Sequence, residues 1–324
     1  SDIKITNDGK EAWCAMEGEI YYSSDFVNNF SSWVLKNPTL PTSTRAQLAI
    51  SKVEASGSYF IYVSSTDYSG CLSGIFKSEN KGQNWSQIVY PGGLDPFSQP
   101  SGTSGCQGWY DHALSVNPAD KDKIYIGGIT FYTWGSGSGG LKRADVIDSE
   151  TETRFLPNYL HADKHIIVFS PHDITGNTMF IGHDGGVSVS YNANSGFPDE
   201  ISYVEENKNY ITLQCYSVGS GKYGEVIAGA QDNGTQYVDY KGISPKAALE
   251  VSGGDGVAGA EISNLDPSIT FSGYVNGVLY RSFNGGETSP DFLSDVIDPA
   301  GCGHITCDVL NSALQNAKYT TFIF

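Results

Sequence analysis

The feature that most constrains the fold of this chain is a pair of apolar runs that recurs along it. In each copy a first apolar run passes through a turn, often Asn-Pro or Asp-Pro, into a second run that ends in glycine. Successive first runs begin at residues 113, 166, 215, 257 and 304, and an earlier copy covers residues 47–63. A period of roughly 40–50 residues, with about four strands in each, is typical of β-propeller blades.

The composition agrees with many short strands joined by turns. The chain has 324 residues, of which 12% are aromatic and 38 are glycine, while charged residues make up only 17%. So few charges argue against a disordered or coiled-coil protein. Helical periodicity is scarce, and only residues 312–318 predict a short helical turn. We therefore expect an all-β fold, a β-propeller of six or seven four-stranded blades that is complete or a fragment of a longer chain.

The repeats define one expected domain, a single β-propeller over residues 1–324. A partial N-terminal blade is expected at about residues 1–40, the repeats at about 45–300, and a partial C-terminal blade at about 301–324. An apolar strand is a poor place for a domain to end, because its edge stays unpaired. The last strand either closes a blade with residues 11–33, or the natural chain continues beyond it.

A second marker is a short polar motif that recurs within the repeats. Residues 78–85 follow the pattern S-x-N-x-G-x-x-W, and residues 282–288 follow S-x-N-x-G-x-T. Degraded copies lie at residues 23–33 and 190–192. The pattern predicts a hairpin turn in which Asn or Asp accepts hydrogen bonds from backbone amides and Gly takes a positive φ. We expect these turns to join the third and fourth strands of their blades and to be structural.

These turns resemble the Asp-box, or BNR repeat, of sialidase-like and sortilin-like propellers. Segments 161–165, 182–187, 231–235 and 253–256 occur in an order similar to that in secreted BNR-repeat propellers of the Bacteroidetes type, which are sortilin-like or glycosyl-hydrolase-like. The resemblance covers about residues 45–295. It implies a secreted or cell-surface propeller, with type IX secretion or cell-surface machinery as a partner.

Propeller geometry predicts where the chemistry-bearing residues gather. Connections between blades, and the turns between second and third strands, open on one face at the axis. The connections between blades that should lie on that face are segments 108–112, 161–165 and 253–256. The turns between second and third strands that should lie there are segments 127–135, 183–186 and 231–234. The candidate ligand-binding residues at this mouth are Trp109, Tyr110, Asp111, His112, Trp134, His161, His165, Asp184 and Asp232. Loops on a rigid scaffold are where binding sites concentrate.

Several kinds of chemistry fit these residue types. Aromatic rings stack on sugar faces, and a carboxylate pair ~5–9.5 Å apart serves glycoside hydrolysis. Asp163 and Asp255 are the candidate catalytic pair. Carboxylate and carbonyl oxygens suit calcium, which is the candidate cofactor, whereas His with Asp suits transition metals. The structural alternative is that Asp-Gly turns simply bond neighbouring backbone amides.

Charge and arginine content exclude several functions. The net charge of −17 argues against nucleic-acid partners and anionic membrane surfaces, and no apolar run approaches the ~20 residues that a membrane span needs. Sialidases need an arginine cluster for the substrate carboxylate. This chain has only four arginines, and none lies in the mouth segments.

The six cysteines indicate the redox compartment. Cys71 with Cys106, and Cys302 with Cys307, are the two candidate disulfides, whereas Cys14 and Cys215 lie in apolar runs and are expected to be buried thiols. An even count favours a secreted protein. We expect a secreted or cell-surface module that binds glycan or protein ligands at the axis mouth. The alternatives are a glycoside hydrolase and a scaffold domain carried as cargo by a bacterial secretion system.

Overall fold

The computed structural model is almost entirely β-strand. Residues described by the structure are 2–29, 31–36, 43–99, 105–147, 156–209, 212–238, 249–252, 255–256, 259–274, 279–285 and 291–292. Within these ranges there is no α-helix, and the single 3-10 turn is η2 (Pro198–Glu200). None of the described segments forms a helix with the length and apolar character that crossing a bilayer requires.

The described strands form six antiparallel sheets of four strands, and each sheet follows the order of the chain. Blade 1 consists of β1 (Asp2–Ile5), β2 (Ala12–Met16), β3 (Glu19–Ser23) and β4 (Val34–Leu35). Blade 2 consists of β5 (Arg45–Ile50), β6 (Ile61–Thr66), β7 (Leu72–Ser78) and β8 (Ser86–Val89). Blade 3 consists of β9 (Ala113–Val116), β10 (Lys123–Gly127), β11 (Phe131–Gly135) and β12 (Lys142–Arg143).

The remaining three sheets repeat this plan. Blade 4 consists of β13 (Lys164–Phe169), β14 (Met179–His183), β15 (Gly186–Ser190) and β16 (Val204–Glu205). Blade 5 consists of β17 (Cys215–Ser220), β18 (Val226–Ala230), β19 (Thr235–Val238) and β20 (Leu249–Ser252). Blade 6 consists of β21 (Ala260–Ile262), β22 (Thr270–Gly273), β23 (Leu279–Ser282) and β24 (Asp291–Phe292). Six four-stranded meanders confirm the predicted fold class.

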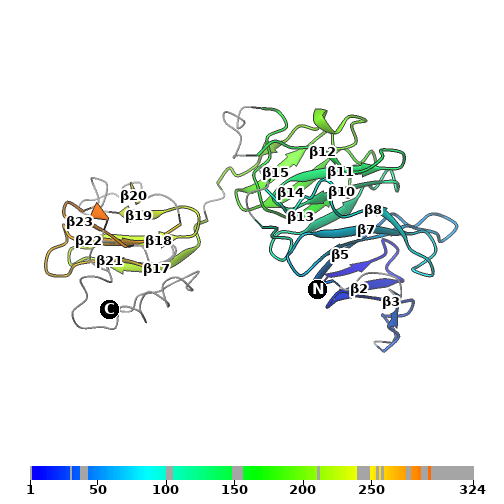
Figure 1. Ribbon diagram of the computed structural model, residues 1–324, viewed down its shortest axis with the longest axis horizontal. Helices are drawn as coiled ribbons and strands as arrows, with labels where there is room; N and C mark the ends of the chain where they lie inside the picture. Colours follow the sequence, from blue (N-terminus) through cyan, green and yellow to red (C-terminus); the bar gives the residue numbers. More distant parts are fainter. Residues whose placement is uncertain are drawn as a thin grey trace. The chain divides into compact units, whose positions relative to one another are not determined.

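The chain divides into two compact units, Ser1–Tyr210 and Ile211–Phe324. Unit 1 holds blades 1 to 4, coloured blue to green in Figure 1, and unit 2 holds blades 5 and 6. Within unit 1 the first strand of each blade contacts the first strand of the next, in the series β1, β5, β9 and β13. Within unit 2, β17 contacts β21 in the same way. Innermost strands that meet in series are the arrangement of propeller blades around an axis. The single domain over residues 1–324 stays a prediction.

The apolar runs identified in the sequence are the first and second strands of the blades. The runs that begin at residues 113, 166 and 215 correspond to β9, β13 and β17, each followed by its predicted partner strand. The run that begins at residue 257 yields only the short strand β21. The run at 304, the helical turn at 312–318 and the expected C-terminal blade all lie outside the described residues.

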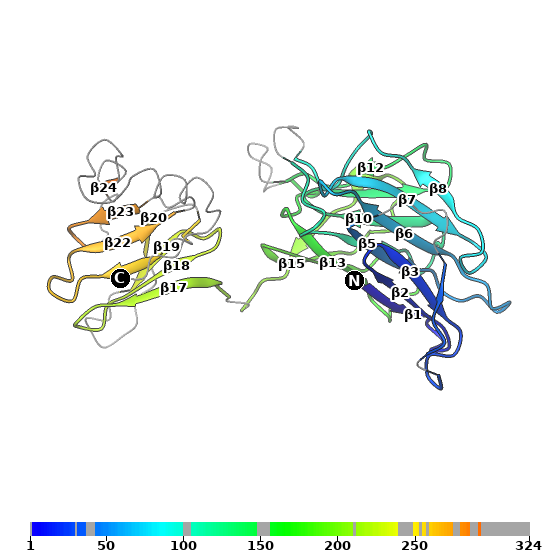
Figure 2. The ribbon, with the colours of Figure 1, turned by 60° about the horizontal axis from the view of Figure 1, so that its bottom comes forward.

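The prediction of a partial blade at residues 1–40 is wrong. Residues Asp2–Leu35 supply a complete four-stranded sheet, and Figure 2 shows β1, β2 and β3 side by side. The error has a physical reason. β1 is only four residues long and half exposed, and β4 is two exposed residues, so neither strand imposes the apolar pattern that buried strands need.

The hydrophobic cores of unit 1 lie between adjacent blades. Trp13, Ile20 and Leu48 pack between blades 1 and 2, and further clusters join blade 2 to blade 3 and blade 3 to blade 4. β6 is buried along its whole length, which explains why its first three residues, 61–63, are all apolar or aromatic. Blade-to-blade packing therefore fixes the loops at the ends of the strands, where the candidate site lies.

The recurring motif, which is S-x-N in blades 2, 4 and 6 and S-x-D in blade 1, occupies the predicted turns between third and fourth strands. In blade 2 the amide of Gly82 donates to Ser78 Oγ at 2.9 Å, and the amide of Asn84 donates to Asn80 Oδ1 at 2.9 Å. Gly82 has φ of +70°. The indole of Trp85 donates to the carbonyl of Lys36 at 2.6 Å. The turn is structural, because it joins blade 2 to blade 1.

Candidate functional site

The candidate site lies in unit 1, where the loops that enter blades 3 and 4 meet the inner turns of those blades. The amide of Lys164 donates to the carbonyl of Gly128 at 2.9 Å, and that of Asp184 donates to the carbonyl of Asp163 at 3.3 Å. The side chain of Gln107 reaches Asp163 across the two blades. The segments of unit 1 that were expected at the mouth therefore do converge.

At the centre of the site, the carboxyl groups of Asp111 and Asp163 contact each other. The Gln107 side-chain amide donates to both, at 3.2 Å to Asp111 Oδ2 and 2.6 Å to Asp163 Oδ1. Asp111 is fully buried. Burial first, and then the neighbouring Asp163, raise the pKa of Asp111 to about 8. Burial and the charge of Asp184 also raise the pKa of Asp163. The pair therefore holds a shared proton at neutral pH when no cation is present.

The third carboxylate of the site, Asp184, is held in its charged form. Burial would raise its pKa, but hydrogen bonds from His165 and Tyr110 outweigh that effect and lower it. His165 Nε2 lies 2.6 Å from Asp184 Oδ1, and the Tyr110 hydroxyl donates to Asp184 Oδ2 at 3.0 Å. We call Asp111, Asp163 and Asp184 the acidic cluster.

Two aromatic side chains stand beside the acidic cluster. Trp109 is 58% exposed and Tyr110 is 38% exposed, with ring centroids 5.9 Å apart. The Tyr110 ring also meets the His165 ring edge-on at 4.9 Å. Arg45 holds the loop that carries these two residues, because its Nη1 donates to the carbonyls of both Trp109 and Tyr110 at 2.8 Å. We call Trp109 and Tyr110 the aromatic shelf.

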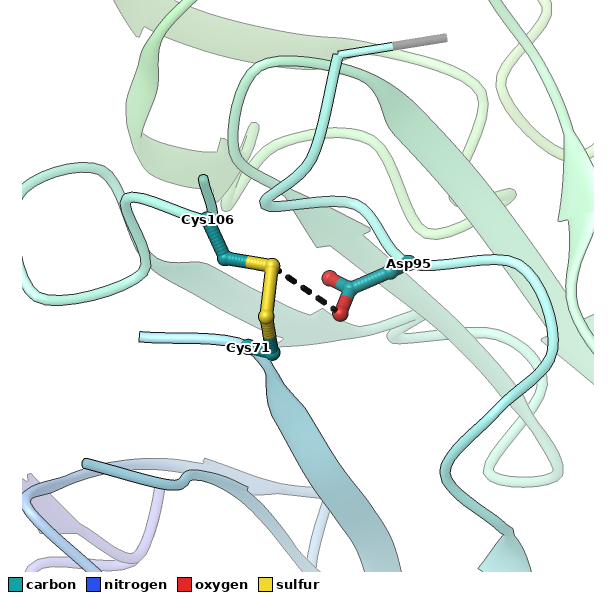
Figure 3. Close-up of side chains that lie close together, drawn as sticks. All are labelled: Cys71, Asp95 and Cys106. Atoms are coloured by element: carbon teal, nitrogen blue, oxygen red, sulfur yellow. Dashed lines mark hydrogen bonds between the residues drawn. A yellow bond between two sulfur atoms is a disulfide. The ribbon is translucent and has the colours of Figure 1, made fainter. Parts of the chain in front are cut away.

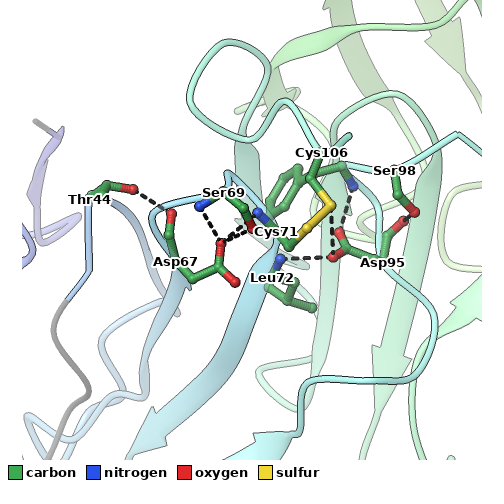
Figure 4. The surroundings of a disulfide bond; sticks show 9 residues. Thr44, Asp67, Ser69, Cys71, Leu72, Asp95, Ser98 and Cys106 are labelled. Carbon is green, nitrogen blue, oxygen red and sulfur yellow. Dashed lines mark hydrogen bonds between the residues drawn. A yellow bond between two sulfur atoms is a disulfide. The ribbon is translucent and has the colours of Figure 1, made fainter. Parts of the chain in front are cut away.

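A disulfide holds the other side of the same loop. Cys71 and Cys106 are bonded, as predicted, and link the β6–β7 turn to the segment before Gln107. Figure 3 shows Asp95 against this bond, with its Oδ2 3.7 Å from Cys106 Sγ. In Figure 4, Asp95 also accepts from the amide of Leu72 at 2.8 Å. Gly70 has φ of +82°, and a Cβ there would lie 2.7 Å from Trp109 Cδ1. The loop that carries the aromatic shelf is therefore covalently anchored and closely packed.

Cys71, Asp95 and Cys106 also form the one described group of three ligand-type side chains close enough to hold a metal ion. Both sulfur atoms are consumed by the disulfide, so the oxidised protein offers no thiolate ligands there. The two cysteines without a disulfide differ in exposure. Cys14 is half-buried, while Cys215 is exposed, so the expectation of a buried thiol is wrong for Cys215. Cys302 and Cys307 lie outside the described residues.

The mouth histidines differ sharply in exposure. His112, predicted to bind ligand, is fully buried against Phe97 and within hydrogen-bonding distance of Ser64 Oγ, at 2.5 Å. Burial lowers its pKa well below the usual value, so it is a neutral core residue and the prediction is corrected. His161 stacks on His183 with centroids 5.3 Å apart. His165, an exposed residue of β13, points its ring at Asp184 of the acidic cluster.

The prediction for Trp134 is also corrected. Residues 131–135 were expected in a mouth loop, but they form β11, and Trp134 is 92% buried in the core between blades 2 and 3. It lines a groove of about 760 Å³ together with Asp120 and Asp122 from the β9–β10 turn. That turn lies at the opposite end of blade 3 from residues 128–130. Residues 130–134 are all Thr or aromatic, which are residue types typical of strands, but the flanking glycines obscured that signal.

Two predicted site residues belong to unit 2. Asp232 has φ of +54°, and its amide donates to Asp255 Oδ1 at 3.3 Å. The two residues therefore lie together at one end of blade 5, as a turn and a neighbouring connection. The pairing of Asp163 with Asp255 stays a prediction.

Three residues of the site were missed in the sequence. Gln107 and Arg45 act on residues distant along the chain, and nothing local marks them. Lys164 is fully buried and pairs with Asp145 at 2.6 Å, while also donating to the carbonyl of Ile129 at 2.8 Å. Gln107 stands one residue before the predicted segment 108–112, so widening that segment would have included it.

Comparisons with known proteins support the fold. No protein-family model matches the chain, and no curated protein matches it. Among solved structures, a GH74 xyloglucanase from Xanthomonas campestris is 13% identical with a TM-score of 0.50, over 88% of this chain and 42% of that one. A GH74 enzyme from Niastella koreensis is 13% identical with a TM-score of 0.42, over 90% and 44%. The chain thus spans less than half of either protein. YCF48 from Cyanidioschyzon merolae is 13% identical with a TM-score of 0.39, over 90% and 83%. The chain has a β-propeller fold.

Proposed function

We propose that this propeller is a secreted or cell-surface binding module that takes a glycan on the aromatic shelf. The observation that carries the proposal is the exposed Trp109–Tyr110 pair beside the ionised carboxylate of Asp184. A sugar ring presents an apolar face that covers an aromatic ring, and hydroxyl groups that donate to a carboxylate.

The rigidity of the shelf favours binding. Arg45 holds the carbonyls of Trp109 and Tyr110, and the Cys71–Cys106 disulfide anchors the same loop. A preformed site loses little conformational entropy on binding, which leaves more of the contact energy as affinity. The disulfide also supports a secreted or cell-surface location, because such bonds persist in oxidising compartments.

The charge of the site limits which class of glycan it can bind. The ionised carboxylate of Asp184 lies beside the shelf, the net charge of the chain is −17, and the Arg45 guanidinium is engaged by backbone carbonyls. Anionic sugars would meet like charge there, so a neutral glycan fits best. Xyloglucan belongs first in the panel, because the xyloglucanase of similar fold acts on it.

The hydrolase alternative finds less support in this geometry. Glycosidases hold their two carboxyl groups ~5–9.5 Å apart around the scissile bond. Asp111 and Asp163 instead contact each other through a shared donor, and Asp111 is fully buried.

The test is a titration of a panel of neutral oligosaccharides, xyloglucan oligosaccharides included, by calorimetry with product analysis. We expect one class to bind, with Trp109→Ala weakening affinity by about 10- to 100-fold through loss of the stacked ring. Tyr191→Ala removes an equally exposed ring from the β15–β16 connection and should leave affinity unchanged. Equal affinity in both variants would refute the shelf as the site. Turnover that Asp163→Asn abolishes would support the hydrolase instead.

A further inference from the structure

No salt bridge of the described residues reaches the contact between Asp111 and Asp163, although Arg45 and Lys164 act on it electrostatically. The ammonium of Lys164 is committed to Asp145 and to the carbonyl of Ile129. The guanidinium of Arg45 donates to two backbone carbonyls. Two carboxyl groups in direct contact away from water cannot both be ionised unless a proton or a cation lies between them. A cation from solution could take the place of the shared proton between them.

A second observation points to a ligand at the same place. Asp111 is fully buried, and its Oδ1 finds no hydrogen-bond donor among the described residues. The other oxygen of the same carboxyl group, Oδ2, shares the Gln107 amide with Asp163. A buried acceptor without a donor is costly, and such atoms in native proteins commonly face water or an ion.

We propose that Asp111 and Asp163, with Gln107, form a calcium-binding site between blades 3 and 4. The two carboxylates offer four hard oxygen ligands. A half-turn of the Gln107 amide would place its oxygen where the nitrogen now meets both carboxylates. Calcium accepts ~6–8 oxygens in irregular arrangements, so water or backbone carbonyls would complete the shell. Magnesium demands a near-ideal octahedron, and the ligands named here include no sulfur or imidazole for softer metals.

The ion would tie the two loops of the site together. Asp111 belongs to the segment that enters blade 3, and Asp163 to the segment that enters blade 4. With only two carboxylates, the affinity should resemble that of extracellular modules, with Kd of ~10⁻⁴–10⁻³ M. Its test needs no glycan, so the proposal stands or fails separately from glycan binding.

The experiment is thermal and urea unfolding of the full chain, first treated with chelator and then given calcium, magnesium or sodium chloride at equal ionic strength. All five tryptophans lie in unit 1, so their fluorescence reports that unit alone. At ~10 mM calcium we expect the unfolding equilibrium constant to fall about 10- to 100-fold, with no such fall in magnesium.

Two variants make the result specific. Asp163→Asn should lose the calcium effect yet be at least as stable as the native chain in chelator, since it leaves only one acidic group in the buried contact. Asparagine also tolerates the φ of +59° at this position. Asp199→Asn, an exposed carboxylate in η2, should keep the full effect. Absence of a calcium-specific shift, or a shift that survives in Asp163→Asn, would overturn the proposal.

Terbium luminescence gives a second readout. Terbium replaces calcium at oxygen-rich sites and emits when nearby aromatic rings are excited. Trp109 and Tyr110 directly precede Asp111, so emission should appear on terbium addition and fall as calcium is added. Emission that calcium does not displace, or that persists in Asp163→Asn, would count against this site.

Discussion

Asp163 is constrained at the site both by its backbone conformation and by the contacts of its side chain. Its φ of +59° lies in the left-handed region, where Asp and Asn are tolerated and a bulkier side chain costs ~1–2 kcal/mol. Its carbonyl accepts from Asp184 while its carboxyl group meets Asp111. The sequence marked it as a mouth residue, but its contact with Asp111 depends on a fold that brings residues 107–111 to blade 4.

His183 provides a pH-dependent test at the same scale. It is buried, it bonds with Ser188 Oγ at 2.8 Å, and burial lowers its pKa from 6.5 to about 4. Because the folded pKa lies below the unfolded one, its contribution to stability is complete above pH 6.5 and is lost as the pH falls toward 4. The shift corresponds to about 3 kcal/mol over that window.

His183→Gln should remove this component. We expect the free energy of unfolding of unit 1, followed by tryptophan fluorescence, to fall less steeply between pH 6.5 and 4 in the variant than in the native chain. His112 is present in both proteins, so its contribution cancels. Parallel pH profiles would show that His183 is not the buried neutral group described above.

At the scale of elements, the disulfide is the contact that most directly shapes the binding loop. It closes a loop across a sequence separation of 35 between the β6–β7 turn and the segment before Gln107. Replacing both Cys71 and Cys106 by Ser should lower the stability of unit 1 by about 2–4 kcal/mol, because the unfolded chain regains freedom. It should also weaken glycan binding, since the aromatic shelf loses its anchor.

Urea unfolding and calorimetry check both effects. Cys14→Ser, at a half-buried cysteine outside any disulfide, is the control and should change glycan affinity little. Unchanged stability together with unchanged affinity in the double variant would show that the loop is held by its other contacts alone.

The elements that could be predicted are those whose burial imposes a pattern. β6 and β10 are almost wholly buried, and each contains a run of three apolar or aromatic residues that makes the strand visible in the sequence. The fourth strands of blades 1, 3 and 4 are only two residues long, and those of blades 1 and 4 are exposed, so sequence alone could not place them. Trp134 was misplaced because glycines at both ends of its strand suggested a loop.

At the scale of the whole molecule, six repeats of one blade account for the positions of most mouth residues. The predicted inner turn at 183–186 and the predicted connection at 161–165 do lie at one end of blade 4, beside residues 128–130 of blade 3. Arg45 could not be assigned in this way, because it reaches Trp109 across 64 residues of sequence. Such contacts depend on how blades pack, and no local pattern encodes them.

The central claim is that ligand binds on the aromatic shelf beside the acidic cluster. Amide hydrogen exchange of the native chain, with and without the glycan selected from the panel, tests that claim most directly. We predict slower exchange in segments 105–112 and 161–165, with no change in the β15–β16 connection at 191–203. Protection confined to that connection or to blades 1 and 2, with none around Trp109, would contradict the account.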